Sequence, residues 1–191
     1  TAREIWDEAN RQLARPDFSA TGILKKFRVE VVCTTDDPTD TLASHQEIAS
    51  QPNYPTRVLP TFRPDRAMKI SDPQAFNAWC DLLAERSGGN TSSFSGFLDA
   101  LRQRHDYFHA NGARLSDHGL EHCPGEFASD EEAAKIFNKA RAGEVVTPEE
   151  AQRFMGNVML FTGRLDAEKD WTKQLHLGAL RNNNSRGVRT L

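Results

Sequence analysis

Short apolar runs alternate with longer segments of helical periodicity along the chain. The strand-like runs cover residues 27–35, 56–62, 113–121 and 172–180. The first run, FRVEVVCTT, is rich in Val and Thr and too short for a helix of its own, which predicts a buried strand. Pro60 weakens the second run, because proline cannot donate a hydrogen bond to a neighbouring strand.

Helix signals fill the segments between these runs. Apolar spacing and start signals predict helices over residues 2–14, 19–26, 38–50, 73–86, 94–110, 130–142 and 148–165. An aspartate before a proline begins the third and fourth helices, at Asp37 and Asp72, and capping boxes begin at Ser129 and Thr147. Strands that alternate with helices in this way predict an α/β fold with parallel strands and right-handed crossovers.

Charge and length exclude several classes of protein. The chain has 191 residues, with 24 Lys and Arg against 27 Asp and Glu, and a net charge of −3. This balance argues against a disordered chain and leaves no basic excess for a nucleic-acid surface. No apolar run approaches the roughly 20 residues that a bilayer-spanning helix needs, so no membrane partner is expected. The charged segment 1–15 is not typical of a signal peptide.

The three cysteines, Cys33, Cys80 and Cys123, are widely spaced and form no CxxC pair. An odd number of cysteines without a pairing framework indicates free thiols in a reducing compartment, so we expect a cytoplasmic protein. Cys33 lies in an apolar strand pattern, where a thiol packs as a small hydrophobic group.

Polar side chains stand in or directly after each strand-like run. They are Asp36, Asp37, Arg63, Asp65, Ser116, Asp117, His118, His176 and Arg181. Ligands of parallel α/β folds bind at the carboxyl ends of the strands, so these side chains predict one shared site. Arginine is suited to binding a carboxylate or phosphate, and aspartate and histidine are suited to proton transfer.

Each of these side chains also has a structural interpretation. The alternatives are helix caps for Asp36 and Asp37, a surface ion pair for Arg63 with Asp65, a turn for Asp117 with His118, and a satisfied core position for His176.

Two histidine pairs stand at four-residue spacing, which can place two metal ligands on one face of a helix. His105 and His109 share one face of a predicted helix, but no third ligand follows and the HExxH glutamate is missing, so we expect a solvated helix face. His118 and His122 straddle Gly119, so helical spacing does not apply to them. No phosphate-binding glycine loop and no GxSxG motif occur in the chain.

Four stretches together resemble one family of enzymes. They are VEVVCTTDDPTDTL (29–42), VLPTFRPDRAM (58–68), GARLSDHGLEH (112–122) and QLHLGALRNNN (174–184). They occur in the same order as in the uronate isomerases, also called glucuronate isomerases, of the amidohydrolase superfamily. The resemblance spans most of the chain, and LHLGALRNNN is its most distinctive part.

The resemblance implies part of a (β/α)8 TIM-type barrel, with about four parallel strands and extra helices in this chain. Residues 1–191 would then form one partial-barrel domain of a longer enzyme, with helical insertions near 72–110 and 130–166. The absence of an initial methionine and the loop-like composition of the last ten residues favour the same interpretation.

The activity that the resemblance implies is aldose–ketose isomerisation of hexuronates. The resemblance thus implies a cytoplasmic enzyme of hexuronate catabolism. The reactions are D-glucuronate to D-fructuronate and D-galacturonate to D-tagaturonate. Carried over position by position, Asp117 and His176 would be catalytic, and Arg63 and Arg181 would bind the substrate.

The chain departs from the family pattern at the metal site. The resemblance implies zinc or another divalent metal in the parent enzyme, held by a His-x-His and an aspartate that this sequence lacks. We therefore expect the segment alone to bind no zinc tightly, to be inactive, and to pair with missing barrel segments or with itself. The alternatives are a metal-dependent hydrolase of the same superfamily and a non-catalytic interaction module.

Overall fold

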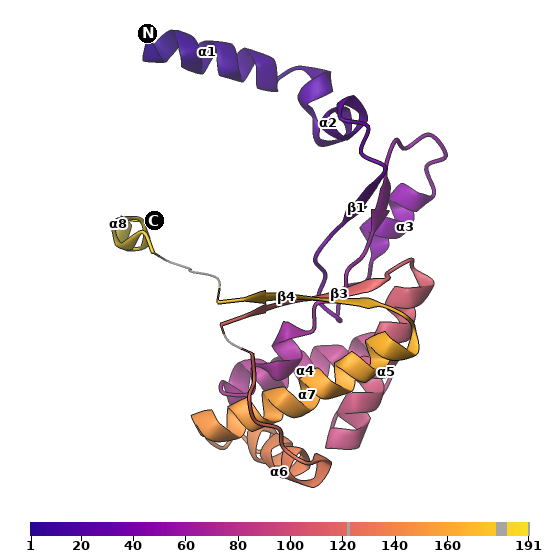
Figure 1. Ribbon diagram of the computed structural model, residues 1–191, viewed down its shortest axis with the longest axis vertical. Coiled ribbons are helices and arrows are strands. Elements are labelled where there is room, and N and C mark those ends of the chain that lie inside the picture. Colours follow the sequence, from indigo (N-terminus) through magenta and orange to yellow (C-terminus); the bar gives the residue numbers. More distant parts are fainter. Residues whose placement is uncertain (122, 179–182, 191) are drawn as a thin grey trace. The chain divides into compact units, whose positions relative to one another are not determined.

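The chain divides into two compact units. The structure is a computed structural model that describes residues 1–121, 123–178 and 183–190 (Figure 1). The first unit comprises residues 1–34 and 42–60, and the second comprises residues 35–41 and 61–191. Each unit is therefore built from two separate stretches of sequence. The expected single partial-barrel domain stays a prediction.

The first unit is a small α/β assembly. It contains helices α1 (Ala2–Leu13), α2 (Ala20–Lys26) and α3 (Ala43–Ala49), the 3-10 helix η1 (Pro16–Phe18), and strands β1 (Val31–Cys33) and β2 (Arg57–Leu59). The two strands pair in parallel, with Val32 opposite Val58. A capping box at Thr1 begins α1, and the Ser19 side chain caps α2, so both predicted helices are confirmed.

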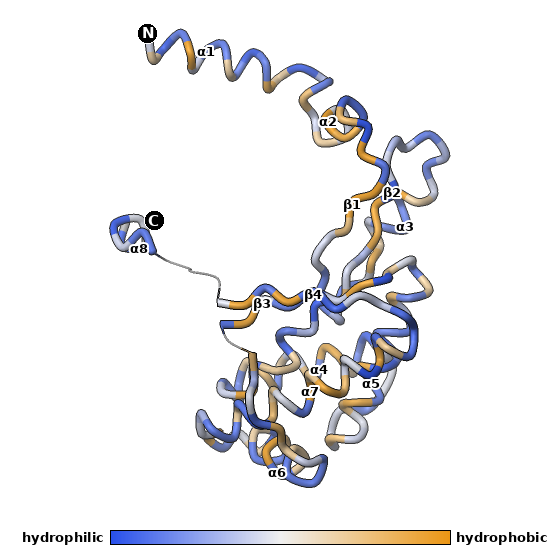
Figure 2. The backbone as a smooth tube through the Cα atoms, in the orientation of Figure 1, coloured by the Kyte–Doolittle hydropathy of each residue, from blue (hydrophilic) through white to orange (hydrophobic). Residues whose placement is uncertain are grey.

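The buried strand predicted over 27–35 is wrong in two respects. Only Val31–Cys33 form the strand, and Val31 is 38% exposed while Cys33 is exposed as well. The physical reason is that this sheet has only two strands in the described structure, with helix α3 in contact with β2. Figure 2 shows β1 and β2 as hydrophobic segments, a composition typical of strands that a larger parallel sheet buries on both faces.

The second unit holds the other two strands, β3 (Leu115–Leu120) and β4 (Thr172–Leu177), which pair in parallel. Two isolated parallel bridges extend this order, one between Asp36 and Phe62 and one between Phe62 and Ser116. Asp36, just after the first run, thus pairs with Phe62 at the end of the second run, and Phe62 pairs with Ser116 of the third run. The third run pairs with the fourth. The predicted parallel α/β arrangement is confirmed to that extent.

Helices make up the rest of the second unit. They are α4 (Pro73–Ser87), α5 (Phe94–Ala110), α6 (Asp130–Arg141), α7 (Pro148–Glu168), α8 (Ser185–Thr190) and the 3-10 helix η2 (Asp65–Met68). The side chains of Asp72, Ser129 and Thr147 cap α4, α6 and α7 as predicted. The short helices η2 and α8 were not predicted.

Aromatic side chains form the core of these helices. Figure 1 shows α4, α5, α6 and α7 grouped together, and their phenylalanines meet between them. The Phe97 ring lies 5.1 Å from that of Phe137, and Phe76 packs edge-to-face against both Phe137 and Phe154. Such aromatic pairs add to the stabilisation from apolar burial, so these four helices form the hydrophobic core of the second unit.

The helix predicted over 38–50 begins only at Ala43. Asp37 does not act as its N-cap, because its carboxylate accepts hydrogen bonds from the Trp79 indole and from Thr39. The guanidinium of Arg104 binds the carbonyl oxygens of Pro38 and Asp40 (for Pro38, Nε to O is 2.7 Å). These contacts within the second unit hold residues 37–40 as a turn. A helix over the same residues would break the contacts.

Candidate functional site

Three of the predicted site residues lie together. Asp117 of β3 stands between the other two, with its Oδ2 3.3 Å from Arg63 Nη1 and its Oδ1 2.7 Å from His176 Nδ1. The Asp117 side chain is only 7% exposed, whereas that of His176 is 54% exposed. A buried carboxylate thus joins a guanidinium to an imidazole that solvent can reach.

Strand geometry explains why Asp117 and His176 meet. In the parallel pairing of β3 with β4, His176 lies opposite Gly119. Side chains two residues apart on a strand share a face, so Asp117 and Gly119 point to the same side of the sheet. Asp117 is therefore a diagonal neighbour of His176, and Gly119 has no side chain to separate them.

Arg63 reaches this site from the segment that follows Phe62. Its backbone N–H donates to the carbonyl of Asp36, and its Nε donates to Asp65 Oδ2 at 2.9 Å. The Arg63–Asp65 ion pair of the structural interpretation is therefore present, together with the contact to Asp117. It is not the surface pair of that interpretation, because the two side chains are only 29% and 13% exposed. The hydrogen bond from Arg63 to Asp65 and their opposite charges raise the pKa of the guanidinium further.

Asp65 is held as a carboxylate by two hydrogen-bond donors and a neighbouring imidazole. Burial opposes its ionisation, but contacts with His118, with Arg63 and with the backbone N–H of Gly119 outweigh it and lower the pKa to about 2. Asp65 thereby remains a fixed negative charge beside Arg63 across the neutral pH range.

A second group of polar residues lies on the opposite face of β3. Ser116 and His118 are fully buried and alternate with Asp117 along the strand. Lys173 of β4 and Asp166 of α7 join them, with Lys173 Nζ 2.7 Å from Asp166 Oδ2. We placed Ser116 and His118 among the polar residues of the predicted site, with a turn as the structural interpretation of Asp117 and His118, and gave Lys173 and Asp166 no role. The turn is wrong, because both Asp117 and His118 lie within strand β3. The available signal was a run of three polar residues, 116–118, within a strand-like segment, because successive residues of a strand point to opposite faces and both faces are then polar.

His105 and His109 serve the packing of the second unit. His105 is buried, its Nε2 lies 3.0 Å from Asp166 Oδ1, and its ring packs on Trp171. His109 Nδ1 accepts a hydrogen bond from the Trp171 indole. The solvated helix face predicted for this pair is wrong for His105, because Asp166 and Trp171 enclose its ring.

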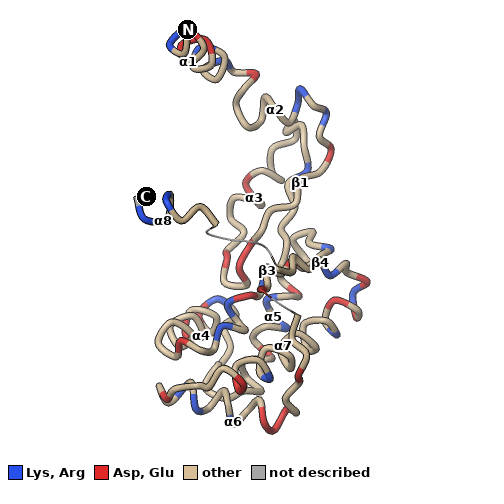
Figure 3. Tube along the Cα trace, turned by 60° about the vertical axis from the view of Figure 1, so that its left-hand side comes forward, with Lys and Arg blue, Asp and Glu red and all other residues tan. Residues whose placement is uncertain are grey.

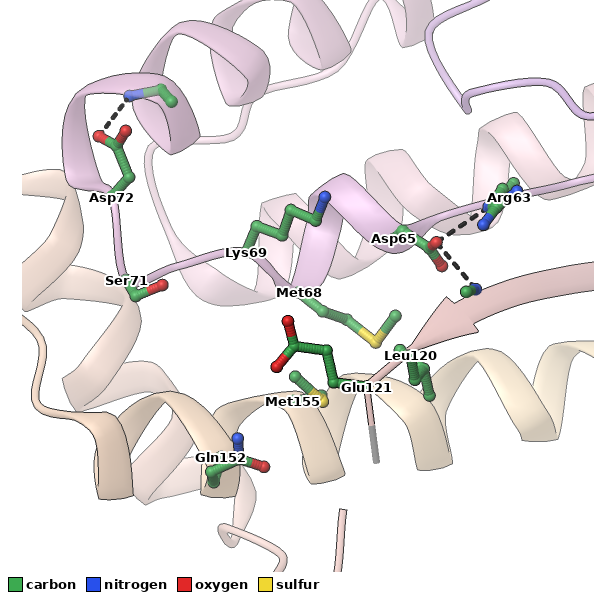
Figure 4. Close-up of a pocket in the computed structure, with 12 residues that line it drawn as sticks. Arg63, Asp65, Met68, Lys69, Ser71, Asp72, Leu120, Glu121, Gln152 and Met155 are labelled. Carbon is green, nitrogen blue, oxygen red and sulfur yellow. Dashed lines mark hydrogen bonds and ion pairs between the residues drawn. The ribbon is translucent and has the colours of Figure 1, made fainter. Parts of the chain in front are cut away.

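A pocket of about 670 Å³ adjoins the site (Figure 4). Arg63 and Asp65 line one part of it, and Met68, Leu120 and Met155 give it an apolar wall. Its other lining residues are Lys69, Ser71, Asp72, Ala75, Gly119, Glu121 and Gln152. A pocket of this size with a few charged groups suits a small polar molecule.

The remaining predicted positions divide into two groups. Asp36 is no helix cap; its Oδ2 accepts the backbone N–H of Thr61, and its own N–H donates to the Thr61 carbonyl. His176 is not the buried core histidine of the structural interpretation, because half of its side chain is exposed. Arg181 and His122 lie outside the described residues.

The described residues do not fit a metal site. Across 1–121, 123–178 and 183–190, no group of three or more His, Cys, Asp and Glu side chains could hold a metal ion. We therefore assign no step of the chemistry to a metal held by these residues.

Within the same ranges, no helix has the length and apolar composition that crossing a membrane requires. Figure 3 shows charges of both signs along most of the helices.

Comparisons with known proteins agree with the motifs. The family model for glucuronate isomerase matches residues 1–191. The uronate isomerase of Solibacter usitatus is 52% identical over 191 residues, which are all of this chain and 41% of that protein. The uronate isomerase of Opitutus terrae is 49% identical over the same span, which is 40% of its length.

Solved structures give the same result at the level of the fold. The crystal structure of a uronate isomerase from Thermotoga maritima matches with a TM-score of 0.87 and 35% identity, over all of this chain and 41% of that one. A glucuronate isomerase from Caulobacter crescentus matches with a TM-score of 0.83 and 28% identity, over 96% of this chain and 38% of that one. The chain spans about two fifths of the length of the curated relatives it matches. By its sequence and by its fold, the chain belongs to the glucuronate isomerase family.

Proposed function

We propose that the protein acts as a uronate isomerase, which interconverts D-glucuronate with D-fructuronate and D-galacturonate with D-tagaturonate. Family membership supports this proposal, and the observation that carries it is the convergence of Arg63 and His176 on the buried carboxylate of Asp117. A non-catalytic interaction module would have no need for such a convergence of polar groups at the strand ends.

The residues suit the chemistry of the reaction. Aldose–ketose isomerisation takes a proton from C2, places one on C1, and moves a proton between the two oxygen atoms, with an enediol between the two forms. Asp117 and His176 supply a carboxylate and an imidazole in direct contact, which are groups that move protons or orient hydroxyls at neutral pH. The exposed imidazole is the member of the pair that a substrate can reach.

The substrate carboxylate needs a fixed cation. Arg63 lines the pocket, and Asp65 and Asp117 hold its guanidinium in place, so it can anchor the carboxylate or a hydroxyl without first changing conformation. Arg181 is proposed for the same task on the strength of the family motif. A hydrolase of neutral amides would have no use for two such arginines.

The family resemblance implies zinc or another divalent metal in the complete enzyme. A bound metal ion of this kind supplies a Lewis acid for a carbonyl or hydroxyl oxygen. The ligands that the resemblance implies are absent from residues 1–191.

We propose a cytoplasmic setting, because all three cysteines are free.

The test uses a complete uronate isomerase polypeptide that carries residues 1–191, called the complete enzyme below. Asp117→Asn and His176→Asn should each lower kcat/KM by about 100-fold or more, because each removes a group that moves or directs a proton. Asp106→Asn, which changes only an exposed partner of Lys169, is the matched control and should retain normal activity. Conversion of D-glucuronate and D-galacturonate is followed by 13C NMR of the ketose products.

Near-normal kcat/KM in both site variants would contradict the assignment of these residues. Failure of the unmodified complete enzyme to convert either hexuronate would contradict the proposed function itself.

A further inference from the structure

The buried group on the far face of β3 is linked to the candidate site by an unbroken series of contacts. Lys173 Nζ lies 2.7 Å from Asp166 Oδ2, 3.2 Å from Ser116 Oγ and 2.9 Å from His118 Nε2. An ammonium group can only donate hydrogen bonds. His118 Nε2 is therefore the acceptor, and the proton of the neutral ring sits on Nδ1.

The protonated side of the His118 ring faces Asp65. His118 Nδ1 lies 3.4 Å from Asp65 Oδ1, an ion-pair distance, and among the described residues neither atom has a hydrogen-bond partner, so each is the nearest partner open to the other. The other oxygen, Asp65 Oδ2, accepts from Arg63 Nε at 2.9 Å and from the Gly119 N–H at 3.0 Å. The orientation of the Asp65 carboxylate is thus set on one side by His118 and on the other by Arg63.

Arg63 is in turn fixed by two carboxylates. Asp65 binds its Nε, and Asp117 contacts its Nη1. We propose that Lys173 and His118 are positioning residues, which act through Asp65 to hold the Arg63 guanidinium in the orientation that receives the substrate. This inference rests on the proposed function, in which Arg63 anchors the hexuronate.

The charges around His118 keep its ring neutral. His118 is fully buried, and it faces Lys173 from β4, Asp65 from η2 and, further away, Asp166 from α7. Burial and the nearby ammonium lower the pKa of the imidazole, against the opposing effect of the two carboxylates. In the neutral ring, the Lys173 ammonium at Nε2 selects the tautomer that carries its proton on Nδ1, the nitrogen that faces Asp65.

Two substitutions of His118 separate positioning from packing. His118→Asn keeps an N–H donor at the place of Nδ1, toward Asp65, whereas His118→Gln extends its amide toward Lys173. The positioning role predicts that KM for D-glucuronate rises by about tenfold in the Gln variant and less in the Asn variant, with kcat changed little in either. A purely structural role predicts the reverse order, because glutamine fills more of the buried space.

A double-mutant cycle tests whether His118 acts through Asp65. In the complete enzyme, Asp65→Asn should raise KM, and His118→Gln should add almost nothing to that rise when the two are combined. Lys173→Met should raise KM as well, while Lys139→Met, which changes an ion pair on the helical surface, should not. Effects of His118→Gln and Asp65→Asn that multiply would overturn the inference while leaving the isomerase function intact.

A measurement without turnover keeps the inference testable in every case. Histidine-selective 15N NMR of the complete enzyme at pH 7, with the signal assigned by its loss in His118→Asn, should show His118 protonated at Nδ1 only. Lys173→Met should shift protonation toward Nε2. A ring protonated at Nε2 in the unmodified enzyme overturns the inference. If the enzyme converts no hexuronate, the proposed function fails and this spectrum alone decides the arrangement.

Discussion

Asp65 and Asp117 approach Arg63 from two sides, and they differ in what surrounds them. Asp65 accepts hydrogen bonds from a backbone N–H and from Arg63 Nε and lies beside a neutral imidazole, whereas Asp117 is in ion-pair contact with the exposed His176. The first arrangement fixes a charge, and the second leaves a proton-carrying group open to solvent. One guanidinium therefore joins a fixed carboxylate to the Asp117–His176 pair for which we propose the catalytic role.

The depressed pKa of Asp65 predicts a pH dependence of stability. A carboxyl group whose pKa is lower in the folded than in the unfolded state stabilises the fold above its unfolded value of 3.8, and this contribution is lost as the pH falls toward 2. Allowing for partial solvent screening, we expect Asp65→Asn to lower the unfolding free energy by about 1–2 kcal/mol at pH 6.

Urea unfolding of the complete enzyme at several pH values measures this difference. The gap between the parent and Asp65→Asn should be constant above pH 5 and narrow between pH 4 and pH 2. The exposed Glu144→Gln is the control and should change the unfolding free energy little at any pH. A gap that widens on acidification would contradict the assignment.

The thiols should differ in reactivity. Burial raises the pKa of Cys80 to about 12, whereas Cys33 and Cys123 are exposed. Because the thiolate is the reactive form, iodoacetamide at pH 8 should alkylate Cys80 far more slowly than the other two in the folded 191-residue polypeptide. Peptide mass spectrometry measures each site, with urea-unfolded protein as the control in which all three react. Rapid native alkylation of Cys80 would show that its site is open.

At the scale of elements, helix ends were the most predictable feature. Asp72, Ser129 and Thr147 cap their helices as predicted, because a cap depends on residues three or four positions away. Asp37 carries the same local signal. Its carboxylate, however, accepts a hydrogen bond from the Trp79 indole, and the carbonyl oxygen of the next residue accepts one from Arg104. Partners more than 40 residues away in the sequence decided that position.

Helix α7 contains a glycine that packing requires. A Cβ at Gly156 would overlap the carbonyl oxygen of Glu126 and lie 2.9 Å from the Phe127 ring. Gly156→Ala should therefore lower the unfolding free energy by about 1–3 kcal/mol, despite the better helix propensity of alanine. Thermal unfolding of the 191-residue polypeptide is the measurement.

The matched control lies on the same helix. A Cβ at Gly163 would meet Lys173 Cε at 3.6 Å, an ordinary contact distance, so Gly163→Ala should be neutral or slightly stabilising. Equal effects at the two positions would mean that helix propensity, and not the approach of the segment around Glu126, sets the outcome.

At the scale of the molecule, the described strands leave apolar surface uncovered. On β4, Leu175 is 40% exposed and Leu177 is 47% exposed. In the described part of the chain, β4 pairs with β3 alone. Unpaired strand edges with apolar side chains favour association, which agrees with the expectation that this segment pairs with further barrel segments or with itself.

The isolated 191-residue polypeptide should therefore self-associate. Light scattering should give a mass above the 21.4 kDa of the monomer, and Leu175→Lys with Leu177→Lys should reduce the association. Val145→Lys, which adds the same charge at an exposed loop position, is the control and should change it little. A monodisperse monomer in the unmodified polypeptide would count against this prediction.

The same polypeptide should retain no stoichiometric zinc after dialysis and show no isomerase activity. The reason is that the metal ligands implied by the family resemblance are absent from its sequence. Elemental analysis and the NMR assay are the measurements. One bound metal ion per chain would show that ligands within residues 1–191 had been missed.

The sequence alone determined most helices, the parallel pairing of the strands and the family, because caps, periodicity and motifs are local patterns. It also placed Arg63, Asp117 and His176 in one site, since parallel strands present their carboxyl ends together. Only the tertiary structure decided the turn at 37–40 and the buried series from Lys173 to Asp65. These depend on partners that distant elements bring into contact, and no local pattern specifies such partners.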